Sequence, residues 1–238
     1  MRNTHFNFKQ FSIQQKNCAM KVCTDACLFG AWVADYIRQN PRYDPVLDIG
    51  TGTGLLSLML AQQSPAKIDA IEIEARCAAQ AKENTEASPW ANRIQIIQGD
   101  IQCFQPVQPY SFIISNPPFF ENDLQAADPS KNKAKHSTHL SLKALFRITR
   151  QYLSPVGEAA FLLPYHRYQK AQVYANENAL YPQEMIHISQ TPLHKPFRTL
   201  LRLGQHKTKT SIHNFSIKIN DGYSKEAIKL LTGYYLAL

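Results

Sequence analysis

The middle of the chain alternates between short apolar runs and longer stretches in which apolar residues have helical spacing. The apolar runs are PVLDI at 45–49, AKIDAIEIE at 66–74, NRIQIIQGD at 92–100, YSFIISN at 110–116 and GEAAFLLP at 157–164. The helical stretches lie at 55–64, 75–87 and 141–155. Units of this kind bury their apolar faces by forming a parallel sheet with helices packed on both sides. The alternation therefore predicts an α/β fold with a mostly parallel sheet.

The last third of the chain has a different pattern. QEMIHISQT at 183–191 and RTLLRLGQ at 198–205 are separated by a short stretch with two prolines, which predicts an antiparallel pair at a sheet edge. FSIKIN at 215–220 predicts a further short strand, and residues 223–238 predict a terminal helix and tail. Because no repeat or linker stands out, we expect one domain over 1–238, with an N-terminal extension at 1–40 and a core at 41–238.

Composition limits the classes of function. The chain has 238 residues, 44% of them hydrophobic, which is enough for one core, and no run is apolar enough to span a bilayer. No secretory signal is visible at the N-terminus, so a cytoplasmic location is expected. Five cysteines without CxxC spacing are interpreted as small buried apolar residues, not as disulfides or a metal site: Cys18, Cys23, Cys27, Cys77 and Cys103. No metal is expected.

A glycine loop follows the first apolar run. Gly50, Gly52 and Gly54 are spaced as GxGxG, whereas dinucleotide sites use GxGxxG. Such glycines let the backbone turn tightly and approach a ligand at the carboxyl end of a strand. Asp48 directly precedes the loop, where a pyrophosphate would gain nothing from more negative charge. The loop therefore favours a ligand with a cationic group and no phosphate, although a purely structural turn is the alternative.

Two more carboxylates end the next two predicted strands. Glu72 closes IDAIE, where it can accept both hydrogen bonds of a ribose diol. Asp100 closes IQIIQGD, where it can accept from an adenine amino group. Each acid alone also fits a surface position or a helix cap. Three acidic strand ends, each after its own apolar run, favour a shared ligand site.

The fourth predicted strand ends in the sequence SNPPFF. Pro117 and Pro118 each fix φ and lack an N–H, so the strand must stop at Asn116. The strand end therefore brings an amide side chain, a rigid turn and the aromatic ring of Phe119 to one place. A plain proline turn is the alternative interpretation.

These motifs, in this order, resemble the class I S-adenosylmethionine-dependent methyltransferases. In that family the glycine loop and the two later acids hold the cofactor, and the NPP-aromatic motif marks enzymes that methylate a planar amino nitrogen. The lone pair of such a nitrogen is delocalised, which makes it a poor nucleophile. The resemblance implies that the Asn116 side-chain oxygen and the Pro117 carbonyl accept its two N–H bonds, while Phe119 stacks on the base.

Further segments resemble the bacterial tRNA methyltransferases that make N6-methyladenosine at position 37 of a valine tRNA. They lie at 8–32, 135–146, 193–203 and 223–238, and the resemblance covers essentially the whole chain. Its most specific part is the N-terminal block MK…TDA…GAW, which in that family closes over the cofactor. Phe119 departs mildly from the family, which often has Tyr there. A Thr24-Asp25 cap on the following helix is compatible with this block.

The resemblance, together with the basic segments, defines a set of candidate residues. The catalytic candidates are Asn116, Pro117, Pro118 and Phe119. The candidates for binding S-adenosylmethionine are Lys21, Thr24, Asp25, Asp48, Gly50, Thr51, Gly52, Gly54, Glu72, Ile73, Asp100, Ile101 and Asn116. The candidates for binding RNA are Lys131, Lys133, Lys135, His136, Lys195 and Arg198.

The net charge of +8 is concentrated in acid-free segments at 1–23 and 131–150. Solvated lysine faces and a polyanionic partner both fit this distribution, and the resemblance favours the anticodon loop of a tRNA. A monomer without membrane or metal partners is expected. The alternatives are methylation of a ribosomal RNA guanine or a release-factor glutamine, whose enzymes carry extra N-terminal domains. A cofactor-binding RNA module without activity is disfavoured by the intact Asn116.

Overall fold

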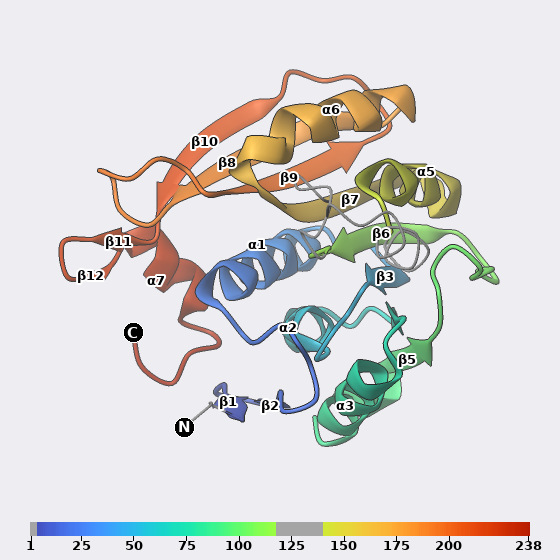
Figure 1. Ribbon diagram of the computed structural model, residues 1–238, viewed down its shortest axis with the longest axis horizontal. Coiled ribbons are helices and arrows are strands. Elements are labelled where there is room, and N and C mark those ends of the chain that lie inside the picture. Colours follow the sequence, from blue (N-terminus) through green and yellow to red (C-terminus); the bar gives the residue numbers. More distant parts are fainter. Residues whose placement is uncertain (1–3, 118–139) are drawn as a thin grey trace, which may run out of the picture.

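The computed structural model describes residues 4–117 and 140–238. Its centre is an eight-stranded sheet in the order β10-β8-β9-β7-β6-β3-β4-β5 (Figure 1). The strands are β3 (Val46–Ile49), β4 (Ile68–Glu72), β5 (Ile94–Gln98), β6 (Tyr110–Ser115), β7 (Leu153–Pro164), β8 (Tyr181–Ser189), β9 (Arg198–Gly204) and β10 (Ser211–Ser216). All five strands from β3 to β7 are parallel to their neighbours among themselves, which confirms the predicted fold class.

The C-terminal strands complete the sheet with mixed pairing. β9 is antiparallel to both β7 and β8, so the predicted antiparallel pair is confirmed. The pair does not form the edge, because β10 lies outside β8 and is parallel to it. β7 also begins at Leu153, directly after a helix and four residues before the predicted run at 157–164. The polar and proline-containing start of β7 gives no alternating pattern from which this extension could be predicted.

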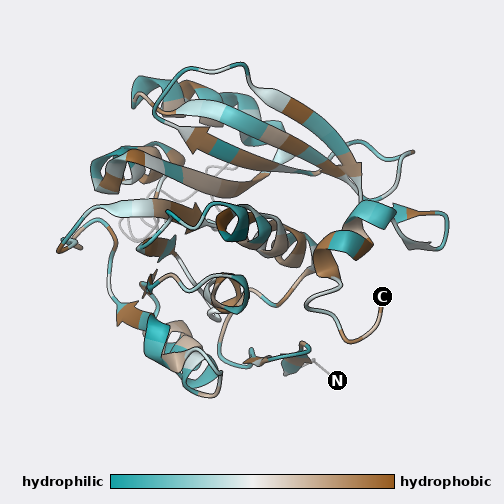
Figure 2. Ribbon diagram, turned by 180° about the vertical axis from the view of Figure 1, so that it is seen from behind, coloured by the Kyte–Doolittle hydropathy of each residue, from teal (hydrophilic) through white to brown (hydrophobic). Residues whose placement is uncertain are grey.

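Helices cover both faces of the sheet (Figure 1). One face is packed by α1 (Thr24–Gln39), α2 (Leu55–Gln63) and α7 (Lys225–Leu231), and the other by α5 (Leu142–Tyr152) and α6 (Tyr168–Glu177). Successive residues of a strand point to opposite faces, so Val46 belongs to the first core and Leu47 to the second. Helix α3 (Ala75–Glu86) packs beside β5. Figure 2 shows hydrophobic residues concentrated in α2 and the central strands.

Helix α2 is buried along almost its whole length and has no polar face. Such a helix needs cover on every side. Helix α1 approaches it so closely that a Cβ on Gly30 would lie 2.7 Å from the Met59 sulfur. On another side the Tyr234 hydroxyl of the C-terminal tail donates to the Met59 carbonyl at 3.0 Å. A larger residue at position 30 would therefore displace the Met59 side chain.

The two ends of the chain pack together. A hairpin of β1 (His5–Asn7) and β2 (Ser12–Gln14) lies beside the C-terminal tail, where Phe8 forms a bridge with Tyr235. β11 (Lys218–Ile219) and β12 (Gly222–Tyr223) form a second small hairpin before α7. Short 3-10 turns, η1 (Ala91–Arg93) and η2 (Tyr165–Arg167), precede β5 and α6. Neither the N-terminal hairpin nor α6 was predicted from the sequence.

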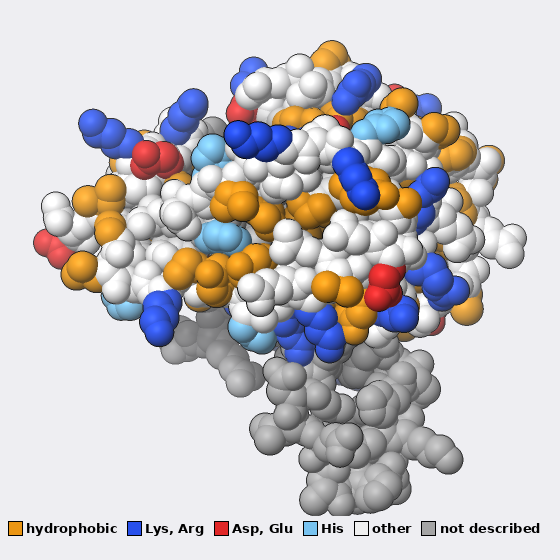
Figure 3. Space-filling view, turned by 90° about the horizontal axis from the view of Figure 1, so that it is seen from above, with side chains coloured by type: hydrophobic (Ala, Val, Ile, Leu, Met, Phe, Trp, Pro, Cys, Tyr) orange, Lys and Arg blue, Asp and Glu red, His pale blue; other side chains and the backbone are white. Residues whose placement is uncertain are grey.

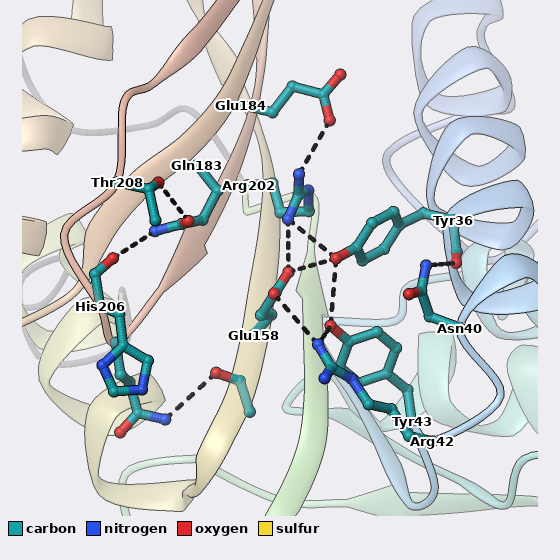
Figure 4. A network of polar contacts seen from close by, with 12 residues as sticks. Tyr36, Asn40, Arg42, Tyr43, Glu158, Gln183, Glu184, Arg202, His206 and Thr208 are labelled. Atoms are coloured by element: carbon teal, nitrogen blue, oxygen red, sulfur yellow. Dashed lines mark hydrogen bonds and ion pairs between the residues drawn. The ribbon is translucent and has the colours of Figure 1, made fainter.

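A polar network lies between α1 and the antiparallel half of the sheet (Figure 4). The Arg202 guanidinium contacts the carboxylate of Glu158 at 2.7 Å and that of Glu184 at 3.3 Å. The Tyr36 hydroxyl donates to Glu158 at 2.9 Å, and Tyr43 lies 3.2 Å from Tyr36. Burial raises the pKa of Tyr36. Arg42, which is largely exposed, adds a longer contact to Glu158 at 3.8 Å, so the network holds the Arg202 charge between two carboxylates and has a second arginine at its outer end.

Candidate active site

The strand order brings the predicted site residues together. β3 is central: the chain continues outward through β4 and β5 on one side and returns to β6 on the other. Ligands of open α/β sheets bind where the order reverses in this way, outside the carboxyl ends of the strands. Ile49 pairs with Ile71 on one side and with Ser115 on the other, so the glycine loop lies between Glu72 and Asn116.

Asp48 is fully buried at the end of β3. Its Oδ2 atom accepts hydrogen bonds from the hydroxyls of Thr51 and Ser57, both at 2.7 Å. Its Oδ1 atom is buried as well and has no hydrogen-bond partner among the described residues. Burial raises the pKa of Asp48 to about 6, although the two hydroxyls act in the opposite direction. An unpaired buried carboxylate oxygen favours a ligand that brings a donor or a positive charge.

The glycine loop is shaped by backbone conformations that favour glycine. Gly50, Gly52 and Gly54 have φ of 72°, 58° and 81°. The loop is also fixed to the neighbouring strand, since the N–H groups of Gly50 and Thr51 donate to the Ile71 carbonyl. No atom lies within 4 Å of the Cβ position of Gly50 or Gly52 in the described structure. The first two glycines therefore leave open space beside the carboxyl ends of the strands, where a ligand can approach the backbone closely.

Glu72 ends β4 and is held against this loop. Its Oε2 atom accepts from the Gly52 N–H at 2.8 Å, and its Oε1 atom accepts from the Glu74 N–H at 3.0 Å. Each carboxylate oxygen can accept a second hydrogen bond. The carboxylate is thus oriented in advance and retains the capacity for two further donors, as its predicted role with a ribose diol requires. Ile73, the next residue, is 47% exposed beside it.

Asp100 lies two residues beyond the end of β5. Its Oδ1 atom accepts from the Gln102 N–H at 2.9 Å, and the following Ile101 side chain is buried. The Gly99 N–H donates to the Glu72 carbonyl at 2.9 Å, which connects this turn to the end of β4. Asp48, Glu72 and Asp100 therefore lie at or just beyond the carboxyl ends of three adjacent strands, β3, β4 and β5.

Asn116 follows β6 on the other side of the glycine loop. The preceding Ser115 hydroxyl donates to the Ile49 carbonyl at 2.7 Å, which fixes the two strand ends to each other. The Asn116 Oδ1 atom is buried and has no partner among the described residues, while its Nδ2 atom donates to the Met20 sulfur at 3.7 Å. Pro117 is buried directly after it. The strand end therefore presents a hydrogen-bond acceptor that nothing in the described structure satisfies.

The N-terminal block reaches the same place. Met20, which lies over Asn116, is 42% exposed. Lys21 donates to the backbone carbonyls of Gln15 and Cys18, so its ammonium group is used to fold this segment. The Val22 N–H donates to the Gln15 side chain at 2.8 Å. These contacts hold the segment beside the site, and a direct contact between Lys21 and the cofactor stays a prediction.

Thr24 and Asp25 begin helix α1, but they do not cap it. The N-cap residue is Cys23, which makes no side-chain cap hydrogen bond, so the predicted Thr24-Asp25 cap is wrong. Instead Asp25, only 8% exposed, accepts from Arg198 Nε at 2.8 Å. Two residues predicted to contact different ligands are therefore joined in one ion pair, which connects α1 to the first residue of β9. Lys195 is exposed in the preceding loop.

Comparison with known proteins identifies the family. A model of the methyltransferase small domain family matches residues 33–163. The tRNA1(Val) (adenine(37)-N6)-methyltransferase of Parabacteroides distasonis is 39% identical over 243 residues, which include all of both chains. The protein of the same name from Aeromonas hydrophila is 38% identical over all of this chain and 99% of its own. The chain belongs to this methyltransferase family.

Solved structures share the fold of the family. A predicted O-methyltransferase from Agrobacterium tumefaciens aligns with a TM-score of 0.64 over 88% of this chain and 96% of its own, with 16% identity. The magnesium protoporphyrin IX methyltransferase of Synechocystis, crystallised with bound SAM, aligns with a TM-score of 0.55 over 76% and 80% at 14% identity. These likenesses confirm the class I methyltransferase fold.

Part of the predicted site lies outside the described residues. This part comprises Pro118, Phe119, Lys131, Lys133, Lys135 and His136, whose roles stay predictions. Within the described residues, no group of three or more His, Cys, Asp or Glu side chains is placed to hold a metal ion. In the same residues no helix is both long and apolar enough to pass through a membrane. Cys18, Cys27 and Cys77 are buried and free as expected, whereas Cys23 and Cys103 are exposed.

Sequence reasoning missed three side chains that build the site. Ser57 donates to Asp48, and its signal was a single hydroxyl within the apolar helix LLSLMLA. Asn84 is 2% exposed and donates to the carbonyls of Thr53 and Gln14, so it fastens the glycine loop to the N-terminal hairpin. Met20 contacts Asn116 across 96 residues of sequence. Neither Asn84 nor Met20 is marked by spacing, because both contacts are formed by the tertiary structure.

Proposed function

We propose that this chain transfers a methyl group from S-adenosylmethionine to the N6 amino group of adenosine 37 in a valine tRNA. One observation carries the proposal: Asn116 holds a buried, unpaired acceptor beside the glycine loop, at the point where the strand order reverses. An acceptor without a partner costs stability, so its retention indicates that a substrate supplies the donor. The names of the full-length relatives support adenine N6 as that donor.

The residues at the ends of β3, β4 and β5 fit the cofactor. The unpaired Asp48 Oδ1 atom suits a cationic group, and the Glu72 carboxylate, already held by two N–H groups, suits a ribose diol. Asp100 lies just beyond the end of the next strand, β5, and suits the adenine end. When bound, S-adenosylmethionine supplies an electrophilic methyl group. The protein's contribution is to hold it across three strand ends, with the glycine loop leaving room for close approach.

The residues at the end of β6 fit the amine. The Asn116 Oδ1 atom and the Pro117 carbonyl can each accept one N–H of an exocyclic amino group, which favours electron density on nitrogen. Because prolines fix the backbone and Ser115 fastens β6 to β3, these acceptors need little reorganisation. Methyl transfer needs no base before attack, since the nitrogen can lose its proton afterwards. We infer that stacking by Phe119 completes this pocket.

Several wider predictions belong to this proposal. We infer a single domain over 1–238 in which the extension at 1–40 closes over the cofactor, supported by the contact between Met20 and Asn116. We also infer that Lys131, Lys133, Lys135, His136, Lys195 and Arg198 contact the anticodon loop of the tRNA, and that the enzyme acts as a cytoplasmic monomer. The positive net charge of +8 supports an RNA substrate.

The test is a methylation assay with defined substrates. Purified protein, S-adenosylmethionine and an unmodified valine tRNA transcript should yield N6-methyladenosine, located at position 37 by nuclease mapping and mass spectrometry of nucleosides. A transcript with guanosine at position 37 and the Asn116→Ala protein serve as controls. Methylation of a release-factor glutamine or of a ribosomal guanine, with no product on tRNA, would overturn the substrate assignment and leave the cofactor assignment intact.

A further inference from the structure

Three aromatic rings form a cluster at the carboxyl edge of the sheet, beyond β7. The Tyr165 ring meets the His187 ring edge to face, with centroids 5.0 Å apart and an interplanar angle of 89°. The Tyr168 ring lies 4.9 Å from His187 and 5.1 Å from Tyr165. The His187 Nδ1 atom lies 3.0 Å from the Thr199 hydroxyl, and burial lowers the pKa of this histidine. The cluster is therefore a neutral aromatic surface above pH 7, held in one orientation.

The cluster stands next to the proposed amine pocket. β7 is parallel to β6, and Phe161 pairs with Ser115. Asn116 lies one residue beyond Ser115 on β6, and Tyr165 lies four residues beyond Phe161 on β7. The two residues are therefore separated by about 10 Å in the direction of the strands and by the spacing between two adjacent strands. The Tyr165 N–H donates to the Phe197 carbonyl at 3.0 Å, which fastens the turn η2 to the start of β9. Tyr165 is thus positioned by the sheet itself, within reach of a neighbouring nucleotide.

Packing alone does not account for Tyr165. Tyr168 packs against the hydrophobic core between the sheet and α5, whereas Tyr165 belongs to neither of the two hydrophobic clusters of the described structure. Its ring is half-buried, with His187 closing one side. A partly exposed aromatic ring with a fixed edge-to-face support resembles the platforms on which proteins stack unpaired bases.

The surroundings of the cluster favour a polyanion. Residues 153–219 contain eight Lys or Arg residues and three acids. All three acids are already in ion pairs: Glu158 and Glu184 with Arg202, and Glu177 with Lys143. Figure 3 shows the face over α6 and β10, where basic side chains stand among histidine and hydrophobic side chains, with scattered acidic side chains beside them. Carboxylates therefore do not oppose a phosphate backbone there.

We propose that Tyr165, supported by Tyr168 and His187, stacks on an unpaired base adjacent to the adenosine that is methylated. This inference rests on the proposed function and deepens it by assigning a second base-binding position. A nucleotide in the anticodon loop is unpaired, so its base can leave its neighbours and lie on the ring at low cost. The phosphates on either side would face the basic residues of η2 and the loop before β9.

The test combines protein variants and RNA variants in a double-mutant cycle. An unmodified anticodon stem-loop of a valine tRNA is methylated by wild-type protein, Tyr165→Ala and Tyr165→Phe, and kcat and KM for RNA are measured. Loss of one stacked base should raise KM about 5- to 100-fold in Tyr165→Ala. Tyr165→Phe, which keeps the ring, should stay within about twofold. The cofactor affinity of all three, measured by calorimetry, should be equal.

Abasic RNA separates stacking from a general effect on folding. Stem-loops with an abasic site on either side of adenosine 37 are given to the unaltered wild-type protein. One of them should raise KM by the same factor as Tyr165→Ala, and with that RNA the Tyr165→Ala change should have no further effect. Equal KM values for wild type and Tyr165→Ala, or additive losses for both abasic positions, overturn the platform while methylation itself persists. Absence of any methylated adenosine in wild type overturns the proposed function as well.

Discussion

Two groups of buried polar side chains lie in the same sheet and are satisfied to different degrees. In the Arg202 network one guanidinium meets two carboxylates, and Tyr36 and Tyr43 add hydrogen bonds around Glu158 (Figure 4). At the other group, the ends of β3 and β6, Asp48 Oδ1 and Asn116 Oδ1 are buried without a partner among the described residues. The network pairs its charged groups with one another and leaves one buried donor, Arg202 Nε, without a partner among the described residues, whereas the site leaves two acceptor oxygens unpaired.

This difference separates side chains that hold the fold from those that await a ligand. In a buried ion pair, each charge offsets the desolvation cost of the other. Removing one partner lowers the free energy of unfolding, because the remaining charge is then buried without compensation. A buried acceptor that stays unpaired costs stability in the free protein and recovers that cost only when a ligand donates to it. The pKa of Asp48 is raised to about 6 for the same reason, because burial without a partner for Oδ1 disfavours the charged carboxylate.

The largest effect is expected from the Arg202 network. Arg202→Ala should lower the free energy of unfolding by about 3–5 kcal/mol, because Glu184 would lose its cation and Glu158 would keep only the exposed Arg42, 3.8 Å away. Urea unfolding followed by circular dichroism measures the change. Arg38→Ala, which breaks the exposed pair with Asp35, is the matched control and should cost less than about 1 kcal/mol. Equal losses in the two variants would contradict a structural role for the network.

A substitution in the site should instead reduce catalysis and leave stability nearly unchanged. Asn116→Ala should lower kcat by roughly 10²–10³, the effect seen when one oriented polar group is removed from a transition-state site. Its free energy of unfolding should stay within about 1 kcal/mol of wild type, since no partner of Oδ1 is lost among the described residues. Single-turnover kinetics and cofactor titration separate chemistry from binding. A variant that turns over at nearly the wild-type rate would remove Asn116 from the acceptor role.

Most residues of the site could be predicted from the sequence, whereas the Arg202 network could not. Strand ends carry local signals: the glycines, the acids after apolar runs and the Asn-Pro-Pro turn are all visible in short windows. The fold class followed from the alternation for the same reason. Strand order leaves no such local signal, so Asn116 was expected beside the glycine loop only because of the family resemblance. Arg202, Glu158 and Tyr36 come from β9, β7 and α1, and nothing in their local windows marks them as partners. Met20 and Asn84 were missed for that reason too.

The unpaired Asp48 oxygen predicts a dependence of stability on pH. The folded-state pKa of about 6 lies above the ordinary aspartate value of 3.8, so the folded protein keeps this proton where the unfolded chain has lost it. The protonated Asp48 therefore adds to the free energy of unfolding in full below about pH 4, and this stabilisation is lost as the pH rises through about 6. Relative to Asp48→Asn, the wild type should therefore lose roughly 2–3 kcal/mol of unfolding free energy between pH 4 and pH 7.

Cofactor binding should lower the pKa of Asp48 again. A cationic ligand favours ionised Asp48, so binding near pH 6 should release a proton, and affinity should fall as the pH drops below 6. Calorimetry in buffers of different ionisation enthalpy measures the released proton directly. Asp48→Asn has no proton to release and is the control. Equal proton release from both proteins would show that another group titrates, and Asp48 would then be a structural acid like Glu158.

The smallest expected effect concerns the contact that joins the N-terminal segment to the site. Asn116 Nδ2 donates to the Met20 sulfur, and this contact keeps Oδ1 of the same amide turned toward the place of the incoming amine. Sulfur is a weak acceptor, so Met20→Leu, which keeps the volume, should lower kcat only about 2- to 5-fold and leave KM for tRNA and cofactor affinity unchanged. Met185→Leu, in the buried core, is the matched control and should leave kcat at the wild-type value. If Met20→Leu and Met20→Ala both keep wild-type kcat, Asn116 is oriented without help from the N-terminal segment, and the unpaired acceptor is set by β6 and its prolines alone.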